Sequence, residues 1–198
     1  RYIKQKSMQE EKKEIRIKGK INDSSKGKDI YFIGVNGLLK RLGGEIDVAK
    51  KNKSDEKEKE ENKRKETDYK ELKEQIGKFN KGNILLYING EKTDYKPFIN
   101  VKKEGEYEIK IIFNVALTTF MGLFFECKNI IEIDLSNFDT KNIKNMSHMF
   151  SFCERLNKIN LSNINTKNVT NMSWMFNGCW YLKEINLLDF DTNNVIDM

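Results

Sequence analysis

Apolar side chains between residues 120 and 198 repeat one pattern three times. The copies begin at Phe120, Met146 and Met172, and each position recurs after 26 residues without an insertion. A fixed period between about 20 and 50 residues is typical of proteins built from stacked units, each of which buries its apolar side against a neighbour. We therefore interpret residues 120–198 as three stacked 26-residue copies.

Two hydrophobic periods alternate within each copy. Leu156, Ile159 and Leu161 follow the alternation of a short strand with one buried side. Apolar residues from Val169 to Leu182 recur every three or four positions, which is typical of one face of a short helix or 3₁₀ segment. Turn and N-cap residues such as Asn165 lie between the two. The pattern predicts a strand, a turn and a helical return in each copy.

Stacking such copies predicts a curved shape. Neighbouring strands lie about 4.8 Å apart, whereas packed helices need about 8–10 Å, so the strands should line the inner face. The predicted fold class is therefore α+β: a leucine-rich-repeat-like solenoid, with a parallel strand ladder and short helical returns, preceded by a small β-rich cap.

Four segments in front of the copies have the composition of strands, and no conformation is predicted for Leu38 to Leu42. Asn89-Gly90 is a strong signal for a type I′ hairpin turn. We expect these strands to cap the first copy, whose apolar interior would otherwise be exposed; an independent binding domain is the alternative. The predicted strands are 14–21, 29–35, 84–88 and 106–113, and the loop between the first two is 22–27.

A highly charged stretch divides the predicted strands. Across residues 51–80 there are ten basic and nine acidic side chains, too little apolar surface to fold alone. We expect disorder or a solvated helix, helical mainly near Tyr69 to Ile76. The predicted domains are a β-rich N-terminal segment (1–49), the charged insertion (50–82), a hairpin region that completes the cap (83–119) and three leucine-rich-type repeats, truncated at the C-terminus (120–198).

Charge and hydropathy narrow the function classes. The net charge of +6 is uneven, because residues 120–198 carry nine acidic and seven basic side chains. This balance argues against nucleic acid as a partner, which requires a basic stripe. No run of 18 apolar residues predicts a membrane span in this segment, and no signal peptide is visible. The chain starts at Arg1 and stops at Met198 within a repeat, so we expect a piece of a longer protein.

The repeats resemble a known family. The run from Ile159 to Cys179 resembles the repeat of BspA-like leucine-rich-repeat surface proteins of bacteria and protists, whose pattern is Leu-Ser-x-Phe-x-Thr-x-Asn-Val-Thr-Asn-Met-x-x-Met-Phe-x-x-Cys. The run has Ile164 in place of the Phe. The resemblance covers about 80 residues. It implies a cell-surface or extracellular location, binding to other proteins or surfaces, and no catalysis.

Two sets of repeated residues are predicted to be structural. The cysteines have no close C-x-x-C pairs or histidine partners for zinc, and helical returns would hold them too far apart for disulfides, so we expect reduced thiols in the core. The asparagines are expected to bind the backbone of a neighbouring copy, with ligand binding as the alternative. The two sets are Cys127, Cys153, Cys179 and Asn142, Asn168, Asn194.

The surface that differs between copies is the predicted binding site. Large exposed aromatic residues are frequent anchors of interfaces, and outward strand positions would form a polar inner face. We predict a non-catalytic binding or adhesion module for a protein or glycan on another cell or surface, with a structural spacer as the alternative. No catalytic, cofactor-binding or metal-ligating residue is predicted, and the oligomeric state stays open. The candidates are Trp174, Trp180, Tyr181, Glu132, Asp134, Lys158, Asn160, Glu184 and Asn186.

Overall fold

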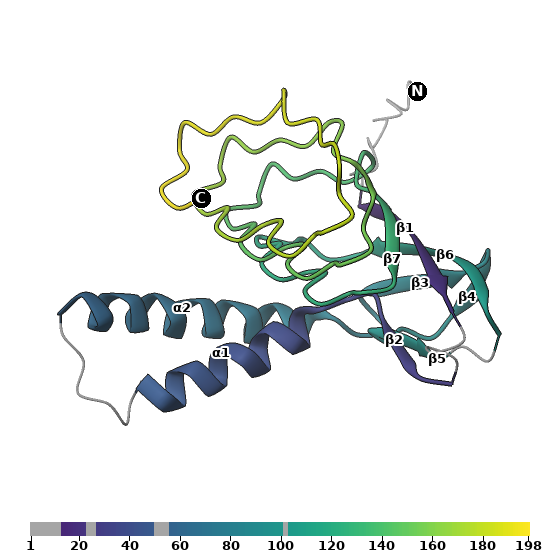
Figure 1. Cartoon of the computed structure of the whole chain (residues 1–198), viewed down its shortest axis with the longest axis horizontal. Helices are drawn as coiled ribbons and strands as arrows, with labels where there is room; N and C mark the ends of the chain where they lie inside the picture. Colours follow the sequence, from purple (N-terminus) through teal and green to yellow (C-terminus); the bar gives the residue numbers. More distant parts are fainter. Residues whose placement is uncertain (1–12, 23–26, 50–55, 101–102) are drawn as a thin grey trace, which may run out of the picture.

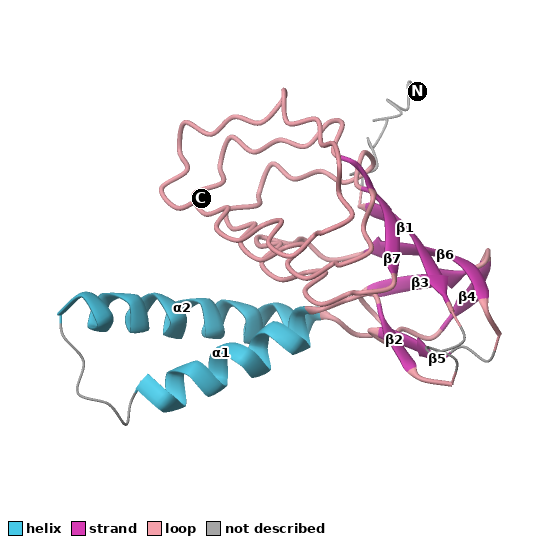
Figure 2. Ribbon diagram, viewed as in Figure 1, coloured by secondary structure: helices cyan, strands magenta, loops and turns pink. Residues whose placement is uncertain are grey.

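A computed structural model describes residues 13–22, 27–49, 56–100 and 103–198 (Figure 1). A twisted sheet lies on one side of the protein, the three copies form stacked loops, and a pair of helices extends beneath the loops (Figure 2). Most of the predicted loop 22–27 and the start of the charged insertion, 50–55, lie outside the described residues.

One mixed sheet of six strands runs through both halves of the chain. Its order is β4-β3-β6-β1-β7-β8, and every pair is antiparallel except β7 with β8. A second, two-stranded sheet pairs β2 with β5. The bounds are β1 Glu14–Ile21, β2 Asp29–Tyr31, β3 Ile84–Ile88, β4 Glu91–Thr93, β5 Phe98–Asn100, β6 Gly105–Phe113, β7 Ile130–Asp134 and β8 Lys158–Asn160.

Local sequence signals explain the first half of this sheet. The predicted strands at 14–21, 84–88 and 106–113 are confirmed as β1, β3 and β6, and their alternating apolar residues face the core. The predicted hairpin between β3 and β4 is also confirmed. Asn89 and Gly90 both have positive φ, 51° and 85°, as a type I′ turn requires.

The predicted fold class, a solenoid with a parallel strand ladder behind a separate cap, is wrong. Strand β1 lies between β6 and β7 and is antiparallel to both, so the strand of the first copy continues the N-terminal sheet. Among the strands of the described residues, only β7 and β8 pair in parallel, and the third copy contributes no strand. The other parallel contacts between copies are single bridges, such as Asn145 with Asn171. Apolar alternation predicted which side of each strand is buried, but it carried no information on which strand lies beside it.

The predicted helical returns are wrong as well. Residues 120–198, all of them described, contain turns and no helix. Gly122 and its equivalents His148 and Trp174 have φ between 55° and 59°, a left-handed conformation that interrupts an α-helix. Backbone N–H groups here alternate between the next copy, as in Gly122 N to Ser147 O at 3.0 Å, and their own segment, as in Leu123 N to Phe120 O at 3.0 Å. Three-residue spacing therefore marks turns that stack in register.

Two helices follow the short β2 strand. Helix α1, Val35–Ala49, begins where the predicted strand 29–35 was expected to end, and that strand stops at Tyr31. Helix α2, Glu56–Lys78, occupies most of the charged insertion and extends well beyond the stretch near Tyr69 to Ile76 where helix was mainly expected. Its buried residues are Leu72 and Gln75. The domain boundaries stay a prediction.

A single apolar core joins all of these elements. It extends from Ile15 on β1 through Leu38 on α1 and Leu72 on α2 to Met175 in the third copy. Because strands, helices and copies share this core, the N-terminal half is part of the same folded unit as the repeats. On the opposite face of the sheet, the outward side chains of β1 and β6 are exposed or half-buried.

Candidate binding groove on the open face of the sheet

The outward side chains of the six-stranded sheet surround a hollow of about 430 Å³. We call this hollow and its lining the sheet groove. Its floor comes from strands of both halves of the chain, and most of its lining residues are of charged or polar types. The lining residues are Arg16, Ile17, Lys18, Tyr87, Gly90, Glu108, Ile109, Lys110, Glu132, Ile133, Asp134, Lys158 and Asn160.

Strand register arranges charges of alternating sign across the groove. Lys18 on β1 lies opposite Glu108 on β6 and opposite Glu132 on β7. Glu132 in turn lies opposite Lys158 on β8. Directly opposed residues lie on the same face of a sheet, so these four side chains form one row. We call it the charge row, and its order is negative, positive, negative, positive.

A second row runs beside the charge row. Arg16 on β1 lies opposite Lys110 on β6 and Asp134 on β7, and Asp134 lies opposite Asn160 on β8. The ammonium of Lys110 lies 4.4 Å from the ring centre of Tyr87, a cation–π contact that covers the aromatic ring in the lining. This row is positive at one end and polar at the other.

Short contacts hold several of these side chains. Lys18 Nζ lies 3.4 Å from a carboxylate oxygen of Glu132, and Arg16 Nε donates to Glu14 at 2.6 Å. Burial raises the pKa of Asp134, but hydrogen bonds from Ser136 and Asn160 and the charge of Arg16 outweigh it, so that pKa is lowered. Asp134 is therefore a carboxylate at neutral pH.

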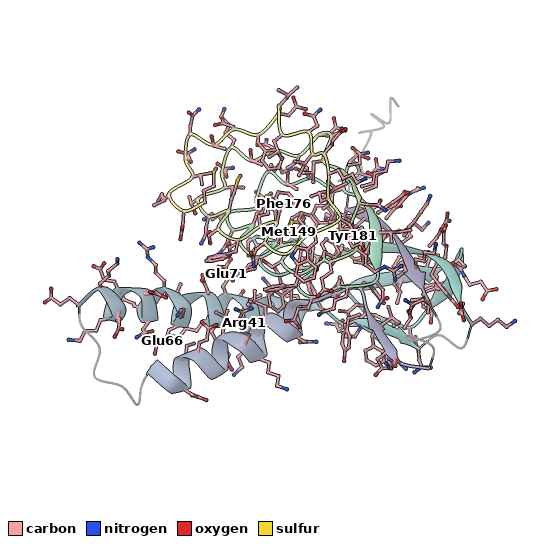
Figure 3. The ribbon with its side chains drawn as sticks, viewed as in Figure 1. Arg41, Glu66, Glu71, Met149, Phe176 and Tyr181 are labelled. Carbon is pink, nitrogen blue, oxygen red and sulfur yellow. The ribbon has the colours of Figure 1, made fainter. Side chains whose placement is uncertain are left out.

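The structure brings four of the predicted binding residues together and separates the others. Glu132, Asp134, Lys158 and Asn160 all line the sheet groove. The other predicted binding residues belong to the third copy, where no strand forms, and none of them lines the groove. Trp174, Trp180 and Tyr181 are exposed to 62%, 74% and 61%, and Glu184 and Asn186 are exposed as well. Figure 3 labels Tyr181 among the stacked copies.

Sequence reasoning missed the other half of the groove. Arg16, Lys18, Glu108 and Lys110 occupy outward positions of β1 and β6, and their alternation with apolar residues was visible in the sequence. That signal showed that they face solvent. It did not show that β1 and β6 lie beside β7, which is what places them in one groove.

The repeated cysteines and asparagines lie between copies. Cys153 Sγ donates to Phe124 O and Cys179 Sγ to Phe150 O, both at 3.0 Å, while Cys127 is buried in the first copy, and all three thiols are free. Asn168 and Asn194 donate to carbonyl oxygens of the preceding copy, Lys141 and Lys167, at 2.7 Å. Asn142 holds the equivalent position in the first copy and is exposed.

His148 is a half-buried ring on the side of the copies. It stacks on Trp174 with a centroid separation of 6.4 Å and planes within 2° of parallel. Burial lowers the pKa of His148, and the positive charge of Arg41 lowers it further. Among the described residues, no group of three His, Cys, Asp or Glu side chains could hold a metal ion. Neither of the described helices is long and apolar enough to cross a bilayer.

Comparison with known proteins adds one similarity. Residues 102–198, just under half of the chain, match the family described as "Mycoplasma protein of unknown function, DUF285". No curated protein and no solved structure matches the chain. The resemblance to BspA-like leucine-rich-repeat surface proteins stays a prediction, and the chain is similar over its repeats to a family whose description assigns no function.

Proposed function

We propose that this protein is a non-catalytic binding module of a surface or secreted protein, and that it holds a protein partner in the sheet groove. The observation that carries the proposal is the charge row, Glu108, Lys18, Glu132 and Lys158, set in a hollow of about 430 Å³. Charges in a hollow are less screened than on a flat surface, so their order can select a partner.

The groove chemistry favours a protein over a glycan. Its lining contains four basic and three acidic side chains, which match the mixed charges of a protein surface. Lys110 covers one face of the Tyr87 ring, so that face is closed to a sugar. Electrostatic complementarity of this kind contributes specificity and association rate more than raw affinity, as suits a module that recognises other surfaces.

Paired arrays would test this proposal. The purified protein is applied to a peptide array of mixed charge and to a glycan array, beside the variant Lys18→Ala with Glu132→Ala. The matched control is Glu60→Ala with Lys63→Ala, which removes the same two charge types from exposed positions on α2. We expect peptide signals that the groove variant loses and the control keeps.

A third variant separates the groove from the exposed aromatic residues. Trp174→Ala with Trp180→Ala removes two predicted anchors outside the groove, and binding in the groove should survive it. Signals on the glycan array alone, or signals lost only with the tryptophans, would overturn the assignment to the groove. The absence of binding on both arrays would favour the alternative function, a structural spacer.

A further inference from the structure

The order of charges in the charge row limits the shape of a partner that can pair with all four. The row crosses β6, β1, β7 and β8, with one charged residue on each strand. Adjacent strands lie about 4.8 Å apart, so the row spans about 14 Å and charges of one sign recur about every 9.6 Å. A partner must repeat its own charges at this spacing.

An extended chain does not have this spacing. Residues on one face of a strand recur about every 6.6 Å, so an extended peptide laid across the groove offers three side chains along the row of about 14 Å. Its third side chain would lie nearer to Lys158 than to Glu132, so it cannot pair with all four charges in order. An α-helix rises about 1.5 Å per residue, and positions i, i+3, i+7 and i+10 form one stripe about 15 Å long. On this stripe, positions of one sign would recur at about 10.5 Å, close to what the row requires.

We propose that the ligand of the sheet groove is an α-helix that lies across the strands and carries alternating charges on one stripe. A basic residue faces Glu108, an acidic residue faces Lys18, a basic residue faces Glu132 and an acidic residue faces Lys158. This inference rests on the proposed function and adds the secondary structure and charge order of the partner.

Charges of the row already pair with each other, so the groove selects a partner by the order of its charges and not by its net charge. Lys18 and Glu132 contact each other, so the groove attracts neither net positive nor net negative partners strongly. A helix with the complementary order places each of its charges against an opposite charge. A helix with another order brings like charges together, which rejects it even when its composition is identical.

Two synthetic helices of identical composition test the inference. Both are alanine-based peptides of about 18 residues, long enough to be helical in isolation, with four charges at i, i+3, i+7 and i+10. The matched peptide has the order Lys, Glu, Lys, Glu, and the permuted peptide has Lys, Lys, Glu, Glu. We expect the matched peptide to bind about tenfold more tightly by fluorescence anisotropy, with a difference that shrinks as salt is added.

The protein itself supplies the matched control. Lys18→Glu combined with Glu132→Lys changes the row to negative, negative, positive, positive, and residues 18 and 132 still carry opposite charges across their strand pair. This double variant should reverse the preference and bind the permuted peptide more tightly. Circular dichroism of the variant checks that the fold is kept.

The outcomes distinguish the inference from the proposed function. Equal binding of the two peptides, binding of neither, or an unchanged preference in the double variant overturns the helical partner. If the peptide array nevertheless shows signals that depend on Lys18 and Glu132, the groove binds a protein partner, but that partner is not an α-helix. If those signals are absent as well, the proposed function fails too.

Discussion

At the scale of single residues, backbone conformation determines how the repeated copies turn. His148 and Trp174 hold the same left-handed conformation as the equivalent Gly122, which costs an L-residue about 1–2 kcal/mol. The stacked neighbour offsets this cost. His148 N donates to Ser173 O at 2.9 Å, as Gly122 N does to Ser147 O, so the strained residue forms part of the contact between copies.

Gly34 is a position where any side chain would collide with backbone. A Cβ there would lie 2.7 Å from the carbonyl carbon of Phe125 and closer still to its oxygen and nitrogen. We expect Gly34→Ala to lower the free energy of unfolding by about 3 kcal/mol, measured by urea denaturation. The matched variant is Gly44→Ala in α1, where nothing lies within 4 Å; it should raise stability by about 0.5–1 kcal/mol. Similar effects of both changes would contradict this account.

The thiols should differ in reactivity according to burial. Burial raises the pKa of Cys179 to about 11 and raises the pKa values of Cys127 and Cys153 further. Cys179 is half-buried and the other two are fully buried. With iodoacetamide at about pH 8, near the ordinary thiol pKa, we expect Cys179 to be alkylated first, as followed by peptide mass spectrometry. In urea all three should react alike, and native labelling of Cys127 before Cys179 would be inconsistent with the core described.

At the scale of elements, one stripe of α2 docks on the stacked copies. Arg64 lies 3.8 Å from Asp197 of the third copy. Burial against the copies raises the pKa of Glu71, and the polar side chains of Thr119 and Asn145 oppose this rise. Figure 3 labels Glu71 between α2 and the copies. This stripe helps to explain why a helix with so little apolar surface is ordered: Arg64 pairs with a charge of the copies, and Leu72 is buried in the shared core.

Asp68, on the same stripe, makes this docking depend on pH. The pKa of Asp68 is raised from 3.8 to about 6, mainly by burial and then by the nearby charges of Glu71 and Asp197, against the opposing effect of Arg64. The folded state therefore binds this proton more tightly than the unfolded state. The stability it contributes is fully present below about pH 4 and is lost as the pH rises through 6.

Replacement of this carboxyl should remove the dependence. We expect Asp68→Asn to exceed the parent protein in stability by about 1 kcal/mol at neutral pH, after allowance for solvent screening, and to lose that advantage near pH 4. Urea denaturation across this range measures the difference. Asp139→Asn should have the opposite effect. Hydrogen bonds from Lys141 outweigh burial and lower the pKa of Asp139, so Asp139→Asn should be less stable than the parent protein at neutral pH. If the effect of Asp68→Asn on stability did not change with pH, the burial of Asp68 against the copies would be refuted.

At the scale of the whole molecule, β1 joins the two halves of the chain. Ile17 is buried and lies opposite Ile109 on β6 and Ile133 on β7. A strand that belongs to both halves couples their unfolding, because neither half keeps its sheet edge covered without it. The protein should therefore unfold as one cooperative unit.

Two spectroscopic signals test this coupling. Both tryptophans, Trp174 and Trp180, belong to the third copy, whereas the described helices are α1 and α2. We expect tryptophan fluorescence and circular dichroism at the helical band to give one common urea midpoint. Ile17→Ala should move both signals together by about 3 kcal/mol of unfolding free energy. Separate midpoints would instead indicate a cap and repeats that fold independently.

The local sequence pattern was enough to predict part of this structure. The 26-residue period, the strands β1, β3 and β6 and the Asn89-Gly90 turn follow from residue type and spacing alone, because burial of one side and positive φ are local requirements. Half of the charged and polar groove lining, including Glu132 and Lys158, was likewise predictable as outward-facing.

Tertiary structure decided the rest. Residues as far apart as Ile17 and Ile133 pair in one sheet, and the returns are turns because their N–H groups bind alternately to the next copy and to their own segment. Alternation specifies which face of a strand is buried, but the identity of its neighbours depends on long-range packing. The sheet groove exists only because β1 lies between β6 and β7.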